Sequence, residues 1–191
     1  MKSVLILIGL TIILLQMGCA PNIALMPIDR SQSKFMNFNG LVVFELPQGE
    51  EWYILKNDSG IGAFGKKLES NDHTFIASSH ISRFTVKHST PEDFLTFTKQ
   101  SRIMDTSPYR FKIIKHEESL DQSKSQYCTK FILTAQVIGK GTIESKGYTC
   151  LHPTYPELGI TIEYSERTKG PRVSEKIRNE GERFINSLKF K

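Results

Sequence analysis

Apolar and polar residues alternate along most of the chain after residue 40, and this pattern constrains the fold more than any other feature. Leu41 begins the first such stretch, which ends at Leu46 and is followed by the turn residues Pro47 and Gly49. Alternation places successive side chains on opposite faces of a β-strand. Further strands are predicted at residues 52–55, 61–68, 73–86, 109–116, 127–138, 148–151 and 160–164.

Two segments have helical signals instead. Thr90 and Pro91 supply a capping hydroxyl and a first-turn proline, and Glu92 and Asp93 follow where the helix dipole favours acids. A second helix is predicted at residues 174–187, with an apolar stripe at helical spacing. These elements predict a single α+β domain over residues 38–191, an antiparallel β-sheet flanked by helices. The stripe consists of Ile177, Gly181, Phe184, Ile185 and Leu188.

The first twenty residues are of a different kind. Lys2 precedes an unbroken apolar run from Val4 to Leu15, and the run is followed by Gly18 and Cys19. This order is typical of a secretory signal peptide. The run is shorter than the roughly 17–25 apolar residues of a membrane-spanning helix. We therefore predict a signal peptide at residues 1–18 and export of the remaining chain.

Gly18 and Cys19 resemble the Leu-x-Gly-Cys box of bacterial lipoprotein signals, although Gln16 stands where that box has leucine. The resemblance implies cleavage before Cys19 and acylation of its thiol by chains such as palmitate. Several acyl chains hold a protein firmly at a membrane surface. The alternatives are an ordinary signal peptide with an incidental cysteine, or an uncleaved anchor. Residues 19–37 lack periodicity and are predicted to be a flexible tether.

The membrane is therefore the first predicted partner, through lipid at Cys19. Ala20 is not the aspartate that retains lipoproteins at the inner membrane in the enterobacterial sorting rule. The resemblance thus implies an outer-membrane lipoprotein that faces the periplasm of a bacterial envelope.

The other two cysteines, Cys128 and Cys150, are predicted to form a disulfide. Exported compartments favour oxidation. A hairpin turn at Gly139 and Gly141 would also place the two residues nearly opposite each other on neighbouring strands. The alternative is two independent buried thiols.

The charge distribution argues against a nucleic-acid partner. The formal net charge of +5 comes from 25 basic and 20 acidic residues, and no long block of either sign occurs. This mixture is typical of a solvated surface. An envelope protein is the predicted macromolecular partner.

Candidate chemical motifs are weak. Residues 60–67 carry glycines in the order of a nucleotide-binding loop, but their alternation and the turn after them favour a bent strand. The five histidines are dispersed, and only Cys150 and His152 place two metal-ligand types on one side of a strand.

Acidic and aromatic residues have simple interpretations as well. Glu117, Glu118 and the acids of the last helix are interpreted as solvated charges. No catalytic, cofactor-binding or metal-binding residue is assigned. The aromatic residues at strand spacing are interpreted as core in preference to a binding groove; they are Trp52, Tyr53, Phe64 and Tyr148.

Residues 38–191 resemble the PsbP-like superfamily. The resemblance rests on the strand at residues 42–46, Pro47 and Gly49 with Trp52 close behind, the helix start at Pro91, and a closing helix that ends at residues 184–188. It implies a sheet sandwiched by helices and a role in binding or assembly without catalysis. We therefore expect a non-enzymatic envelope module, and the alternative is a periplasmic small-ligand carrier or a hydrolase whose site forms only in the fold.

Overall fold

The computed structural model describes residues 26–29, 35–38, 40–70, 72–105, 108–138 and 141–191. The signal peptide at residues 1–18 and the lipidation at Cys19 fall outside these ranges, so both stay predictions. Within them, no helix is long and apolar enough to span a membrane.

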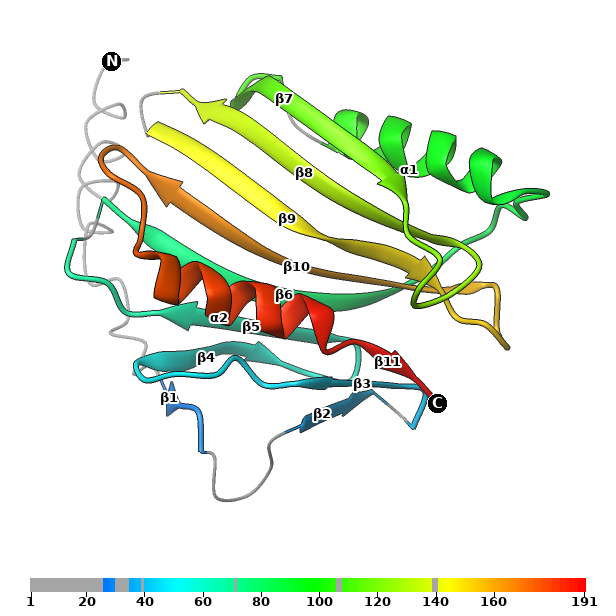
Figure 1. Cartoon of the computed structure of the whole chain (residues 1–191), viewed down its shortest axis with the longest axis horizontal. Coiled ribbons are helices and arrows are strands. Elements are labelled where there is room, and N and C mark those ends of the chain that lie inside the picture. The colour runs from blue at the N-terminus through cyan, green and yellow to red at the C-terminus, as the bar shows by residue number, and fades with distance from the viewer. Residues whose placement is uncertain (1–25, 30–34, 39, 71, 106–107, 139–140) are drawn as a thin grey trace, which may run out of the picture.

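The described chain forms two antiparallel sheets and two helices (Figure 1). The larger sheet has the strand order β1-β4-β5-β6-β10-β9-β8-β7, and the smaller one has the order β11-β3-β2. The predicted α+β class is confirmed. In chain order the elements are β1 Met26–Pro27, β2 Phe35–Phe38, β3 Val42–Glu45, β4 Trp52–Asn57, β5 Ile61–Lys66, β6 Thr74–Arg83, α1 Pro91–Asp105, β7 Phe111–Leu120, β8 Cys128–Val137, β9 Gly141–Leu151, β10 Leu158–Thr168, α2 Glu175–Asn186 and β11 Lys189–Phe190.

Three short strands differ from the sequence prediction. Met26–Pro27 pairs with β4, and Phe35–Phe38 pairs with β3, although the first segment and residues 35–37 of the second lie in the predicted tether. Lys189–Phe190 pairs with the other edge of β3. Each of these strands is formed by hydrogen bonding to a neighbouring strand, which the alternation of its own residues does not reveal.

The main core lies between one face of the large sheet, α2 and the small sheet. Ile160, Ile162 and Tyr164 point from β10 toward this core and are almost fully buried, as are Phe184 and Ile185 of α2. Figure 1 shows α2 lying across this face of the sheet. The helical stripe predicted at residues 174–187 is therefore confirmed as the buried face of α2.

Gly181 lets α2 approach the sheet closely. A Cβ atom at this position would lie 2.7 Å from Cγ of Tyr164 and 3.1 Å from Cζ of Phe75. Real Cβ contacts are not this short, so any side chain here would push the helix away from the sheet.

The predicted disulfide is confirmed. Cys128 and Cys150 are directly opposite in the β8–β9 register and are joined by a disulfide bond. Both are fully buried and belong to the same core as α2. The bond therefore fastens two central strands on the α2 face of the sheet.

The other helix, α1, covers the opposite face of the large sheet near its β7 edge (Figure 1). The backbone amide of Asp93 donates a hydrogen bond of 3.1 Å to Oγ1 of Thr90, which confirms the predicted cap. Because α1 packs mainly on β7 and β8, it leaves most of the same face of β9, β10 and β6 without a helix over it, as far as the described residues show.

Candidate functional site

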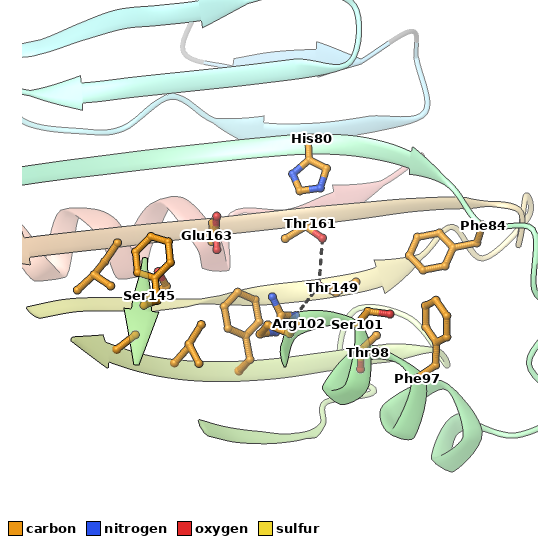
Figure 2. Close-up of a pocket in the computed structure, with 15 residues that line it drawn as sticks. His80, Phe84, Phe97, Thr98, Ser101, Arg102, Ser145, Thr149, Thr161 and Glu163 are labelled. Carbon is orange, nitrogen blue, oxygen red and sulfur yellow. Dashed lines mark hydrogen bonds between the residues drawn. The ribbon is translucent and has the colours of Figure 1, made fainter. Parts of the chain in front are cut away.

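A hollow of about 450 Å³ lies between α1 and the part of the sheet that α1 leaves uncovered. We call it the α1 hollow. Figure 2 shows α1 on one side of it, with β9, β10 and β6 across from the helix. Its lining residues are His80, Phe84, Phe97, Thr98, Ser101, Arg102, Phe111, Phe131, Leu133, Ala135, Ile143, Ser145, Thr149, Thr161 and Glu163.

Strand alternation builds this lining. On β8 the residues that face α1 are apolar, among them Phe131 and Ala135, so the helix is drawn to that part of the sheet. On the next two strands the same face carries small polar residues, such as Thr149 and Thr161. The sheet face thus changes from apolar to polar at β9, where the helix cover ends.

Arg102 projects from α1 into the hollow and is held on three sides. Its guanidinium carbon lies 3.3 Å from the ring centroid of Phe131. Its Nε donates to Oε2 of Glu118 at 3.2 Å, and its Nη2 donates to Oγ1 of Thr149 at 3.0 Å. A stacked guanidinium with a carboxylate partner has little freedom to reorient. Arg102 is therefore a preformed part of the wall.

Glu118 is the buried partner that fixes Arg102. Its side chain has no exposed surface, and its carboxylate also accepts a hydrogen bond of 2.8 Å from Oγ1 of Thr129. Nε2 of His116 lies 2.9 Å from its Oε2. Burial is the largest influence on its pKa and opposes ionisation, but the hydrogen bonds and charge of Arg102 and the Thr129 hydroxyl together keep that pKa below its ordinary value.

This position corrects one sequence interpretation. Glu117 is solvated as expected, with a side chain 56% exposed, but Glu118 is buried. Successive strand residues point to opposite faces, and α1 covers the face to which Glu118 points. The acids of α2 are also not all solvated, because Glu180 accepts hydrogen bonds from Trp52 and Lys66 in a nearly buried cluster.

A hydroxyl chain leads from Arg102 across the sheet. Oγ1 of Thr149 lies 3.1 Å from Oγ1 of Thr161, and Figure 2 marks both contacts. Beyond Thr161, which is opposite His80 in the β10–β6 register, the hollow reaches its rim. Burial lowers the pKa of His80, and the charge of Arg102 adds to this effect.

Glu163 stands two residues from Thr161 on the same face of β10. Burial raises the pKa of its carboxyl group, and the charge of Arg102 opposes that shift. The two acids near the helix thus differ: the contacts of Glu118 favour its carboxylate, whereas the burial of Glu163 favours its neutral form.

The other sequence candidates lie elsewhere. Residues 61–66 of the glycine-bearing segment form β5, as the strand interpretation predicted. Cys150 is bonded to Cys128 and is not a free thiol ligand for a metal beside His152. Among the described residues no cluster of three or more His, Cys, Asp and Glu side chains is placed to hold a metal ion. Of the aromatic residues interpreted as core, Trp52, Phe64 and Tyr148 are buried there and Tyr53 is only half-buried.

Sequence reasoning missed Arg102 and Glu118 as a pair. In the structure His116 and Glu118 lie on the same face of β7 as Phe111, which lines the hollow, because a register shift between Ile113 and Lys115 interrupts the alternation. Strict alternation from Phe111 would place them on the opposite face, so the pairing needed the three-dimensional structure.

Comparison with known proteins gives similarity to solved structures only. No family model matches the chain, and no curated protein matches it. The solution structure of cyanobacterial PsbP (CyanoP) from Synechocystis sp. PCC 6803 is similar with a TM-score of 0.46 and 13% identity, over 92% of this chain and 99% of that one. A mutant of protein Mog1 is similar with a TM-score of 0.44 and 8% identity, over 81% and 94%. The Ran-binding protein Mog1p of Saccharomyces cerevisiae has a TM-score of 0.42 and 7% identity, over 79% and 90%. No residue role is carried over from these proteins.

Proposed function

We propose that this chain is a non-enzymatic binding module of a bacterial envelope, anchored by lipid at Cys19, and that its ligand or partner occupies the α1 hollow. The observation that carries the proposal is the uncovered sheet face with a fixed guanidinium at its border. A domain that only needed stability would gain by covering this face. Within the described part of the chain about 450 Å³ stays open instead, beside a side chain that is already oriented.

The geometry supports binding more than catalysis. Arg102 and Glu118 form an ion pair, and the side chain of Glu118 is completely buried behind Arg102 in the wall of the hollow. A general acid or base must reach its substrate, and a carboxylate in this position does not. The contacts of Glu118 orient Arg102 and hold α1 against the sheet.

The volume of the hollow favours a small molecule as the ligand, and thus a small-molecule carrier as the form of this binding module. Pockets for small ligands occupy roughly 300–1,000 Å³ and combine apolar walls with a few polar groups. The α1 hollow has this composition, with four phenylalanines together with hydroxyl and charged side chains.

Crosslinking in intact envelopes tests the hollow as the binding site. A photoreactive amino acid replaces Ser145, which lines the hollow, and in a matched control it replaces Glu117, which is exposed on the other face of β7. We expect an adduct with a small molecule or a protein from Ser145 and none from Glu117. Equal adducts from both positions, or none from Ser145, would contradict the proposal.

A separate measurement tests the anchor. We expect the intact mass of the purified protein to show cleavage before Cys19 and added acyl chains. We also expect Cys19→Ala to release the protein from the membrane fraction. A variant that stays membrane-bound at mature size would show that the lipid is not the anchor.

A further inference from the structure

Three titratable side chains line the α1 hollow in the described structure, His80, Arg102 and Glu163. Of these, Glu163 has no ionic or hydrogen-bonding partner and does not stand at the rim. The formal charge of Arg102 is met by Glu118 immediately behind it. His80 stands at the rim, and its lowered pKa favours the neutral imidazole. Within the part of the chain that the structure describes, Glu163 takes part in no hydrogen bond or ion pair, and its only resolved electrostatic neighbour is Arg102.

The space beside Glu163 is kept open by a glycine. Gly147 of β9 is opposite Glu163 in the β10–β9 register. A Cβ atom on Gly147 would lie 2.7 Å from Cβ of Glu163, so any side chain at Gly147 would crowd the carboxyl-bearing stem. On the other side, β6 presents only Ser78 opposite Glu163. Glu163 is therefore flanked on the two neighbouring strands by a glycine and a serine.

Apolar side chains make up much of the same hollow. Phe131, Leu133 and Ala135 of β8 and Ile143 of β9 belong to its lining, and Phe131 is opposite Gly147, the cross-strand neighbour of Glu163. Phe84 and Phe97 also line it, with ring centroids 5.7 Å apart. Aromatic faces attract cations and apolar bodies alike. The lining thus combines one uncompensated acid with a large apolar surface.

We propose that the α1 hollow binds a small organic cation, an amine on an apolar or aromatic body, with its ammonium group at Glu163 and its body against the phenylalanine walls. This inference rests on the proposed function, because it assigns a ligand class to the same hollow. A bound ammonium would give the Glu163 carboxylate the partner that the protein itself does not provide. An anionic ligand would meet an unpaired acid at this point, and the guanidinium of Arg102 is already bonded to Glu118 and Thr149.

The inference also sets the direction of a pH effect. The charged and titratable groups around Glu163 are Arg102 on α1, His80 on β6, and His116 with Glu118 behind Arg102. Burial raises the pKa of the free Glu163 carboxyl, whereas an ammonium ligand beside it favours the ionised form, so protonation of Glu163 and binding of the ligand oppose each other. Binding is then weakened as the pH falls.

The test uses the full chain in nanodiscs of phosphatidylcholine and isothermal titration calorimetry, with empty nanodiscs as the blank. Three probes share one aromatic body: phenethylamine is a cation, phenethyl alcohol is neutral, and 3-phenylpropionate is an anion. We expect phenethylamine to bind at least about tenfold more tightly than the other two, the ratio typical of one charge-assisted hydrogen bond. We also expect its affinity to fall when the pH is lowered from about 7.5 to about 5.

Three variants complete the test. Glu163→Gln has the shape of the neutral acid and should retain the fold, and we expect it to remove the preference for the amine without changing the affinity for the alcohol. Glu163→Asp keeps the charge one methylene further back and should retain part of the preference. Glu117→Gln is the exposed control and should bind all three probes as the native protein does.

Three results would overturn the inference. The first is tighter binding of the anion or the alcohol than of the amine, and the second is an amine affinity in Glu163→Gln within about twofold of the native value. The third is absence of binding by all three probes. Any of these results, together with a specific adduct from Ser145, would leave the hollow as the binding site and remove only the cationic ligand.

Discussion

Replacing Glu118 with glutamine should reveal how much the fold depends on the buried cluster beneath α1. The carboxylate accepts hydrogen bonds from Arg102 at 3.2 Å and from Thr129 at 2.8 Å, and its side chain is fully buried while that of Arg102 is 15% exposed. Breaking a buried ion pair on one side costs about 3–5 kcal/mol. Glutamine keeps one acceptor oxygen, and Arg102 retains some access to water. We therefore expect Glu118→Gln to lower the free energy of unfolding by about 2–4 kcal/mol at neutral pH.

The same substitution should have a defined pH dependence. The folded-state pKa of Glu118 lies below its unfolded value. Its ionisation therefore contributes stability above the unfolded pKa, and this contribution is lost as the pH falls through the folded pKa. The stability difference between the native protein and Glu118→Gln should be greatest near neutral pH and should shrink below about pH 4.

Urea unfolding followed by tryptophan fluorescence provides the assay. Trp52 is the only tryptophan of the chain, and it is 2% exposed in the core on the far side of the sheet, so it reports global unfolding. Glu117→Gln is the matched control and should change stability by less than about 1 kcal/mol, since its ion pair with Lys115 is exposed. The reasoning fails if Glu118→Gln stays within about 0.5 kcal/mol of the native protein, or if the difference persists unchanged into acid.

Two further predictions concern the core on the α2 face. Replacing Cys128 and Cys150 with alanine should lower stability by about 3 kcal/mol in the chain-entropy model, because the disulfide closes a loop with a sequence separation of 22; equal urea midpoints with and without the bond would contradict this. Gly181→Ala should destabilise the protein by about 1–3 kcal/mol even though alanine favours helix, because its Cβ would meet the ring of Tyr164 at 2.7 Å. Gly170→Ala is the control, since nothing lies within 4 Å of its added methyl group, and a loss of stability as large as that of Gly181→Ala would show that the contact with Tyr164 is not the cause.

The longer strands could be predicted from the sequence because each shows its own alternation. In the strand predicted at residues 127–138, Phe131, Leu133, Ala135 and Val137 stand at every second position, and the register of β8 places them on one face. The cysteine pair was predicted from turn position and compartment together. In both cases the residues that allow the prediction lie within one short segment or within one hairpin.

The candidate site depended on contacts between distant segments. Arg102, Glu118 and Thr149 come from α1, β7 and β9, and nothing local to any of them indicates the other two. Glu117 and Glu118 are the same residue type, and only the docking of α1 on one face of β7 separates a solvated acid from a buried one. The short strands β1, β2 and β11 could not be predicted for the same reason, since each forms only by pairing with another strand.

The two faces of the large sheet have a consequence for how such a chain changes over generations. On β9 and β10 the even-numbered residues, such as Tyr148, Cys150, Ile160 and Ile162, belong to the core, whereas the odd-numbered residues, such as Ser145, Thr149, Thr161 and Glu163, line the hollow. A substitution at an odd position alters what the hollow can hold while its chain neighbours keep the core intact. Mutations at every second residue of β9 and β10 can thus change the binding specificity without disturbing the core. In a saturation mutagenesis screen for folding alone, the tolerance of substitution along these two strands should alternate with a period of two residues.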